Sequence, residues 1–187
     1  LRINPWILSH EDQIAFFGDS DLDTKSGLQN LVRFEITPPE KMVDFCDHTK
    51  WNFRIDEIKV PEWINSTLLE SDVRDFLFNM LNECISVKEG ETLAILDGRH
   101  IAVKGTGIIS RLNNAIIMFL LDKITIHNAG SSTVQNADSS TIQYAGSSTI
   151  QYAGSSTIQY AESSTIQYAG SSTIKNKNSA KISFAEN

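Results

Sequence analysis

The stretch Ser147-Ser-Thr-Ile-Gln-Tyr-Ala-Gly154 is the best-preserved unit of a repeat that fills the last third of the chain. A fixed period of this kind marks an architecture in which each unit buries its apolar side chain only by stacking on its neighbours. An octapeptide is long enough for one short strand and one turn, so the repeat predicts a β-solenoid. The aliphatic residues that recur at this period are Ile126, Val134, Ile142, Ile150, Ile158, Ile166, Ile174 and Ile182.

Alternation along the strand assigns the two sides of each unit. It places Ile150 and Ser148 inside the solenoid and Thr149 and Gln151 outside. The β-branched residues favour a strand, and Ala-Gly favours a turn. We expect Ala145, which lies beyond the corner, to return to the interior. The tyrosine position holds Asn in some units and an aromatic residue in others, which favours a corner or a surface ladder over the core.

The period leaves the cross-section of the solenoid open. Two octapeptides in each coil would give a flattened, two-sided coil, and three or more would give a triangular one. With two in each coil, the regular repeat makes about four coils, spaced by roughly 4.8 Å. The changed stretch Lys175–Lys181, together with Phe184, indicates a polar cap over the last coil.

The first half of the chain has a different pattern, which predicts a small α+β domain over residues 1–90. Predicted helices lie at 9–17, 39–45 and 68–87, and predicted strands lie at 31–36 and 53–60. The last of these helices has the clearest apolar stripe at helical spacing. The solenoid is predicted over 91–187, with irregular coils at 91–124, regular coils at 125–182 and the cap at 175–187.

Composition limits the classes of partner. The formal net charge of the 187 residues is −7, and most of the acidic residues precede the repeat. This balance argues against binding to nucleic acid or to an anionic membrane, although it leaves mimicry of nucleic acid open. The N-terminus does not read as a signal peptide, and the apolar run Ala115–Leu121 is too short to span a bilayer. We therefore expect a cytoplasmic protein that binds neither nucleic acid nor membrane.

Motifs for metals and cofactors are weak. The acids of Asp19-Ser-Asp21-Leu-Asp23 alternate as at the start of a calcium loop, but Thr24 and Asn30 depart from that motif, which favours a solvated turn. Cys46 and His48 lie two residues apart without a second ligand cluster, so a helix end is favoured over a metal site. The prediction is therefore no metal, no cofactor and no catalytic constellation.

Two groups of residues are candidates for binding. Trp51 and Trp63 bracket a strand that contains Arg54; these three residues would form a binding patch, although packing in an aromatic core is favoured for the tryptophans. The second candidate is the outward threonine ladder of the repeat, which would order water and bind ice, or would only stabilise stacked strands. Its residues are Thr133, Thr141, Thr149, Thr157 and Thr165.

The segment from Phe45 to Trp63, Phe-Cys-Asp-His-Thr-Lys-Trp-Asn-Phe-Arg-Ile-Asp-Glu-Ile-Lys-Val-Pro-Glu-Trp, is followed by octapeptide repeats. In this it resembles a group of uncharacterised bacterial and phage proteins with repeats like Asn-Ala-Thr-Val-Glu-Ala-Tyr-Gly. The present unit exchanges the Ala and Tyr positions. The repeat also faintly resembles ice-nucleation repeats, which share Ala-Gly and Ser-Thr elements. The resemblance implies an α+β unit before a solenoid and assigns no activity.

Three functions compete. The first is a non-enzymatic protein-binding or scaffold protein, related to phage and acting on a host protein. The second is an ice-binding protein that uses the threonine ladder. The third is an enzyme with a site between the two units, built from Asp47, His48 and His100. The sequence favours the first, and the apolar run Ile116–Leu121 predicts a homo-oligomer if part of it stays uncovered.

Overall fold

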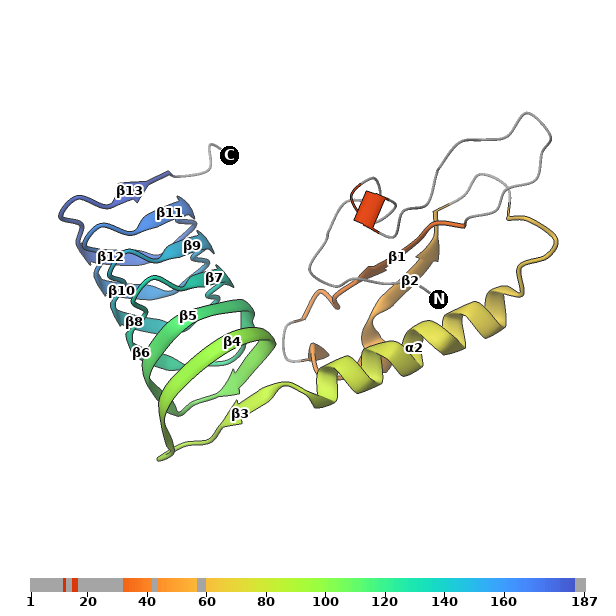
Figure 1. Cartoon of the computed structure of the whole chain (residues 1–187), viewed down its shortest axis with the longest axis horizontal. Helices are drawn as coiled ribbons and strands as arrows, with labels where there is room; N and C mark the ends of the chain where they lie inside the picture. The colour runs from red at the N-terminus through yellow and green to blue at the C-terminus, as the bar shows by residue number, and fades with distance from the viewer. Residues whose placement is uncertain (1–11, 13–14, 17–31, 42–43, 57–59, 184–187) are drawn as a thin grey trace. The chain divides into compact units, whose positions relative to one another are not determined.

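The structure is a computed structural model that describes residues 12, 15–16, 32–41, 44–56 and 60–183 (Figure 1). It divides into two compact units, Leu1–Asn79 and Met80–Asn187. Residues 12, 15 and 16 are helical; the rest of the predicted helix at 9–17 and the acidic stretch Asp19–Asp23 lie outside the described residues.

The first unit contains a two-stranded antiparallel sheet of β1 (Phe34–Thr37) and β2 (Asn52–Ile55). Both strands were predicted from sequence. The short 3-10 helix η2 (His48–Lys50) lies between them in the chain. The predicted helix at 39–45 is confirmed only in part. Pro39 is irregular and Glu40 and Lys41 form a bend, whereas Asp44 is a 3-10 residue whose N–H donates to the carbonyl of Lys41.

The main helix, α2 (Ser66–Asn82), confirms the predicted helix at 68–87 but ends five residues earlier. The side chain of Asn65 caps its start, because Oδ1 accepts from the N–H groups of Thr67 and Leu68 at 3.1 and 3.2 Å. One stripe of the helix is buried through Val73 and Leu77. Burial of each such side chain stabilises the fold by about 1.5–3 kcal/mol.

The second unit is a β-solenoid of about six turns (Figure 1). Its first strands are β3 (Ile85–Val87), β4 (Thr92–Gly105) and β5 (Ile108–Leu120), and all strand pairs in this sheet are parallel. Because β3 pairs with β4, the stack begins at Ile85 rather than at residue 91. The regular strands that follow are β6 (Thr125–Asn128), β7 (Thr133–Asn136), β8 (Thr141–Tyr144), β9 (Thr149–Tyr152), β10 (Thr157–Tyr160), β11 (Thr165–Tyr168), β12 (Thr173–Asn176) and β13 (Lys181–Ile182).

Each regular strand pairs with the next strand but one. The strand order is β12-β10-β8-β6-β5-β7-β9-β11-β13. Even-numbered and odd-numbered regular strands therefore form two faces, and β5 is long enough to pair with β6 near its start and with β7 near its end. Two octapeptides make one coil, which resolves the cross-section as flattened and two-sided.

The interior confirms the assignment of sides. The aliphatic column from Ile126 to Ile166 is fully buried, and Ala145 and Ser148 are buried beside it. Thr149 and Gln151 lie outside and are half-buried by their neighbours in adjacent coils. Parallel in-register stacking thus gives every central coil the same dry core.

The last coil continues this stack. β12 pairs with β10, and β13 pairs with β11, so Lys175–Ile182 belong to strands and a turn of the solenoid. Ile174 and Ile182 are half-buried. A cap over the coil would have to include residues 184–187, which lie outside the described residues, and it stays a prediction.

Candidate functional site

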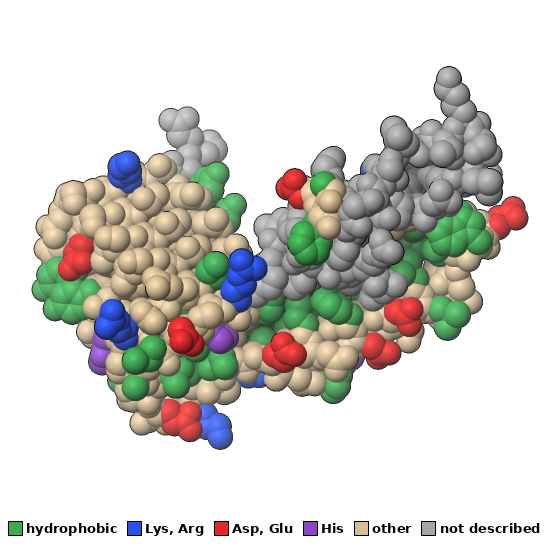
Figure 2. Space-filling model, in the orientation of Figure 1, with side chains coloured by type: hydrophobic (Ala, Val, Ile, Leu, Met, Phe, Trp, Pro, Cys, Tyr) green, Lys and Arg blue, Asp and Glu red, His purple; other side chains and the backbone are tan. Residues whose placement is uncertain are grey.

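The threonine ladder is split between the two faces of the solenoid. Thr141 and Thr157 are register partners on one face. Thr133, Thr149 and Thr165 are register partners on the other. The five predicted threonines are all outward and half-buried, so they form two short columns rather than one array. The side chains and backbone on the viewed face of the regular coils are mostly polar and uncharged (Figure 2).

The tyrosines lie at the corners of the coils and are exposed, as the sequence predicted. Tyr144 stacks on Tyr160 with ring centroids 4.9 Å apart, and Tyr152 stacks on Tyr168 at 4.8 Å. Their planes are within 8° of parallel. Sequence reasoning anticipated a surface ladder but not this pairing, which requires knowing that partners are two units apart in the chain.

At two of the tyrosine positions an asparagine side chain bonds the next turn. The Oδ1 of Asn128 accepts from the N–H of Gly130 at 2.8 Å, and the Oδ1 of Asn136 accepts from the N–H of Asp138 at 3.0 Å. This is the local side-chain-to-backbone bond that Asn favours in turns. Asn128 and Asn136 therefore stabilise a corner by a local bond, whereas the tyrosines stack between coils.

Each turn of the repeat needs one residue in the left-handed backbone conformation, with a positive φ. Gly146 has φ +62°, and a Cβ added there would lie 2.7 Å from the carbonyl oxygen of Gly130. Glu162 occupies the same position of its unit with φ 52°.

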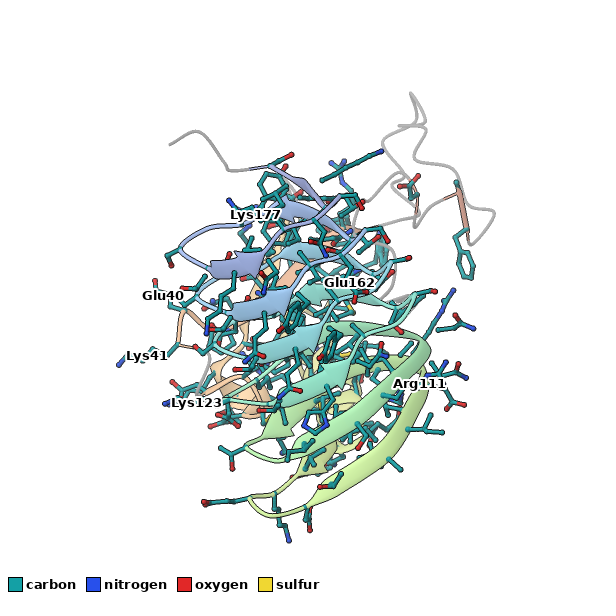
Figure 3. All side chains as sticks on the ribbon, turned by 90° about the vertical axis from the view of Figure 1, so that its left-hand side faces the viewer. Glu40, Lys41, Arg111, Lys123, Glu162 and Lys177 are labelled. Carbon is teal, nitrogen blue, oxygen red and sulfur yellow. The ribbon has the colours of Figure 1, made fainter. Side chains whose placement is uncertain are left out.

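Figure 3 shows that Arg111 and Glu162 lie along one edge of the coils and Lys123 along the opposite edge. Over β6–β11 the two acidic residues, Asp138 and Glu162, are therefore both at turns.

The tryptophan–arginine patch is not formed as one surface. Trp51 is buried; its Nε1 donates to the carbonyl of Phe45 at 2.8 Å, and the two rings meet edge-on at 5.0 Å. Arg54 is exposed and contacts Glu35 across the β1–β2 pair at 2.7 Å. Trp63 is exposed. Trp51 therefore belongs to the core, whereas Arg54 and Trp63 remain available at the surface.

Arg74 bonds two segments of the first unit to each other, and the sequence analysis did not identify it. Its Nε and Nη2 donate to Oε1 of Glu70, one turn earlier on α2, at 2.9 and 2.6 Å. Its Nη1 donates to the carbonyl of His48 at 3.0 Å. The sequence shows the Glu70–Arg74 spacing that favours a helical ion pair, but nothing in it indicates the bond to His48. Arg74 thus ties the η2 segment to α2.

The residues of the enzyme hypothesis belong to different units. In the first unit, the carboxylate of Asp47 accepts from the hydroxyl and the N–H of Thr49, and these bonds hold the pKa of Asp47 below its usual value. Beside it, the ring of His48 contacts Phe78 edge-on. In the second unit, Nε2 of His100 contacts the carbonyl of Asp97 at 2.6 Å. Each group has a local structural partner, and the enzyme hypothesis stays a prediction.

Potential metal and ligand sites are limited in the described part of the chain. Residues 32–41, 44–56 and 60–183, with residues 12, 15 and 16, contain no group of three His, Cys, Asp or Glu side chains placed to hold a metal ion. Cys46 and Cys84, both among the described residues, are not joined in a disulfide. A shallow hollow of about 260 Å³ beside the first coil is lined by Ile85, Ser86, Val87, Glu91, Thr92 and Leu93. Glu91 in this lining is engaged by the N–H of Lys88.

The fold and these surfaces define the class: a β-solenoid with two octapeptides in each coil, preceded by a small α+β unit. Comparison with models of protein families, with curated proteins and with solved structures finds no match for the chain. Among the helices of the described residues, none has both the length and the apolar character needed to cross a membrane. The resemblance to phage octapeptide-repeat proteins stays a hypothesis.

Proposed function

We propose that the chain is a non-enzymatic scaffold protein, in which the solenoid serves as a rigid spacer and the first unit binds a protein partner. The observation that carries the proposal is a set of large apolar side chains exposed on the first unit. Trp63 is 57% exposed, Leu68 62% and Phe78 49%. Exposed aromatic and aliphatic residues of this size are typical anchors at protein interfaces.

The solenoid supports the spacer role. Its parallel coils share one continuous core, in which the central aliphatic and alanine columns are fully buried. Stacked coils of this kind resist bending because each strand is bonded to the coils before and after it. Its surface bears few charges over β6–β11, where Asp138 and Glu162 are the acidic residues.

The class of partner follows from the resemblance to phage proteins, so we propose a bacterial host protein. The experiment immobilises the full chain and passes a bacterial lysate over it, and each retained protein is purified and tested again for direct binding. The Trp63→Ser/Leu68→Ser variant should lose this binding. Tyr152→Ser is the matched control, because Tyr152 is similarly exposed, at 52%, but lies on the solenoid.

The proposal fails if no purified protein binds the chain directly. It also fails if the double variant binds as well as the wild type while Tyr152→Ser does not, because recognition would then belong to the solenoid. A circular dichroism spectrum identical to that of the wild type is required of each variant.

Ice binding is the second candidate, and the in-register threonines favour it. Thr125, Thr141, Thr157 and Thr173 repeat at the strand spacing on one face. The test is inhibition of ice recrystallisation by the wild type and by Thr141→Lys/Thr157→Lys. Inhibition lost in the variant would support ice binding, and normal ice growth with concentrated wild type would end the idea.

A further inference from the structure

The four tyrosines of the chain all lie in the two stacked pairs. One pair, Tyr144 and Tyr160, projects from the corner after β8 and β10, and the other, Tyr152 and Tyr168, projects from the corner after β9 and β11. Their exposed fractions run from 39% to 52%, so a reagent in solvent reaches every ring. This arrangement holds phenol groups together in pairs within one chain.

We propose that each stacked pair is a site of oxidative cross-linking, which joins successive coils through a dityrosine bond. The required co-reactant is hydrogen peroxide, used by a heme peroxidase that removes one electron from each phenol. Each phenol loses one electron and its hydroxyl proton. The two phenoxyl radicals couple through ring carbons ortho to the oxygens, and the ortho hydrogens then move to the oxygens. The peroxide takes up the two electrons and two protons and leaves as two molecules of water.

The geometry favours coupling within a chain over coupling between chains. The rings of a pair are held face to face, 4.8–4.9 Å apart, so each radical forms beside its partner without a bimolecular encounter. Tyr144 and Tyr160 are on strands in direct register, as are Tyr152 and Tyr168. The backbone pairing thus keeps the rings together for as long as the coils are folded.

The consequence is a covalent staple between coils. Each bond would close a loop that passes once around the solenoid, and cross-links of this kind restrict the unfolded chain. The oxidised protein should therefore unfold at a higher temperature than the untreated protein. The modification would strengthen the rod without changing its surface ladders.

Two double variants with equal tyrosine content test the proposal. Tyr144→Phe/Tyr160→Phe leaves the stacked pair Tyr152 and Tyr168. Tyr144→Phe/Tyr152→Phe leaves Tyr160 and Tyr168, which lie at opposite corners. Phenylalanine retains the ring and its packing but has no hydroxyl to oxidise. Each dilute full-length protein is treated with peroxidase and hydrogen peroxide, and dityrosine fluorescence is measured.

The first variant should give about half of the wild-type fluorescence, because one of two pairs remains, and the second should give none from the monomer band of a denaturing gel. Peptide mapping of the wild type should recover Tyr144–Tyr160 and Tyr152–Tyr168 cross-links. In denaturant the two variants should behave alike. Equal monomer fluorescence from the folded variants, or wild-type cross-links found only between chains, would overturn the proposal.

Discussion

At the scale of the residue, one position in each turn of the repeat requires a positive φ, and only some of the residues at that position are glycine. Gly130, Gly146, Gly154 and Gly170 have the positive φ that glycine adopts freely, whereas Asp138, Glu162 and Asn178 adopt it with a side chain. A left-handed conformation costs about 1–2 kcal/mol for an ordinary residue. Local strain is therefore stored at a few known turns.

Glu162→Gly should stabilise the solenoid by about 1 kcal/mol, because glycine relieves most of that strain and loses part of the gain to its greater freedom when unfolded. Gly154→Ala is the opposite control. Its φ is +58°, and the added Cβ would lie 3.1 Å from the carbonyl oxygen of Asp138. Urea unfolding measures both free energies of unfolding, and destabilisation by Glu162→Gly would contradict the assigned turn.

The buried serines give a second prediction at this scale. The hydroxyl of Ser156 is buried without a partner, whereas that of Ser132 accepts from the N–H of Ala115 at 3.0 Å. Ser156→Ala should be neutral or stabilising, and Ser132→Ala should cost about 1–3 kcal/mol because it leaves a buried N–H unpaired. Thermal unfolding of the two variants checks this order; equal losses would show that the two hydroxyls have equivalent partners.

At the scale of the element, each regular strand presents one side chain to the core and two to the outside. Ile158 is fully buried between Ile142 and Ile174, whereas Thr157 lies on the outer face. Ile158→Ala should therefore cost about 2–5 kcal/mol. Thr157→Ala, the neighbouring control, should cost less than about 1 kcal/mol. Similar losses at the two positions would mean that the sides of β10 have been exchanged.

The strands and their buried sides were largely predictable from sequence. A strict period indicates which residues are buried, and β-branched residues favour strands. Ile150, Ser148 and Ala145 lie inside as expected. The number of octapeptides in a coil was not predictable, because both cross-sections bury the same column. The sequence also did not show that the irregular coils are one residue longer than the regular ones. Ile108 pairs with Thr125, 17 residues later, whereas Thr125 pairs with Thr141, 16 residues later.

The candidate site was less predictable than the fold. The stacking of Tyr144 on Tyr160 depends on which units are neighbours in space, and the bond from Arg74 to His48 joins segments far apart in sequence. Pro38-Pro39 suggested a helix start, yet Glu40 and Lys41 form a bend, and among the described residues of that segment only Asp44 has 3-10 geometry. The apolar run Ile116–Leu121 suggested an oligomer; Ile117 and Leu120 are fully buried in the solenoid core, and the oligomer stays a prediction.

At the scale of the whole molecule, a repeat protein should tolerate the loss of a complete coil. Deletion of residues 141–156 removes β8 and β9 and rejoins equivalent turns, so the remaining coils should stack with the same core. Deletion of 141–152 joins one turn to another and should disrupt the coils that follow. Amide hydrogen exchange in β10–β13 measures the difference, and equal protection after both deletions would argue against a coil-by-coil core.

The central claim is that residues two octapeptides apart are neighbours, and disulfide formation tests it most directly. In a background with Cys46 and Cys84 replaced by serine, Thr141→Cys/Thr157→Cys joins register partners on one face, within the Cα separation that a disulfide spans. Thr141→Cys/Thr149→Cys places the thiols on opposite faces. Mild oxidation should close an intrachain disulfide in the first protein and none in the second; rapid closure in the second alone would contradict the two-sided solenoid.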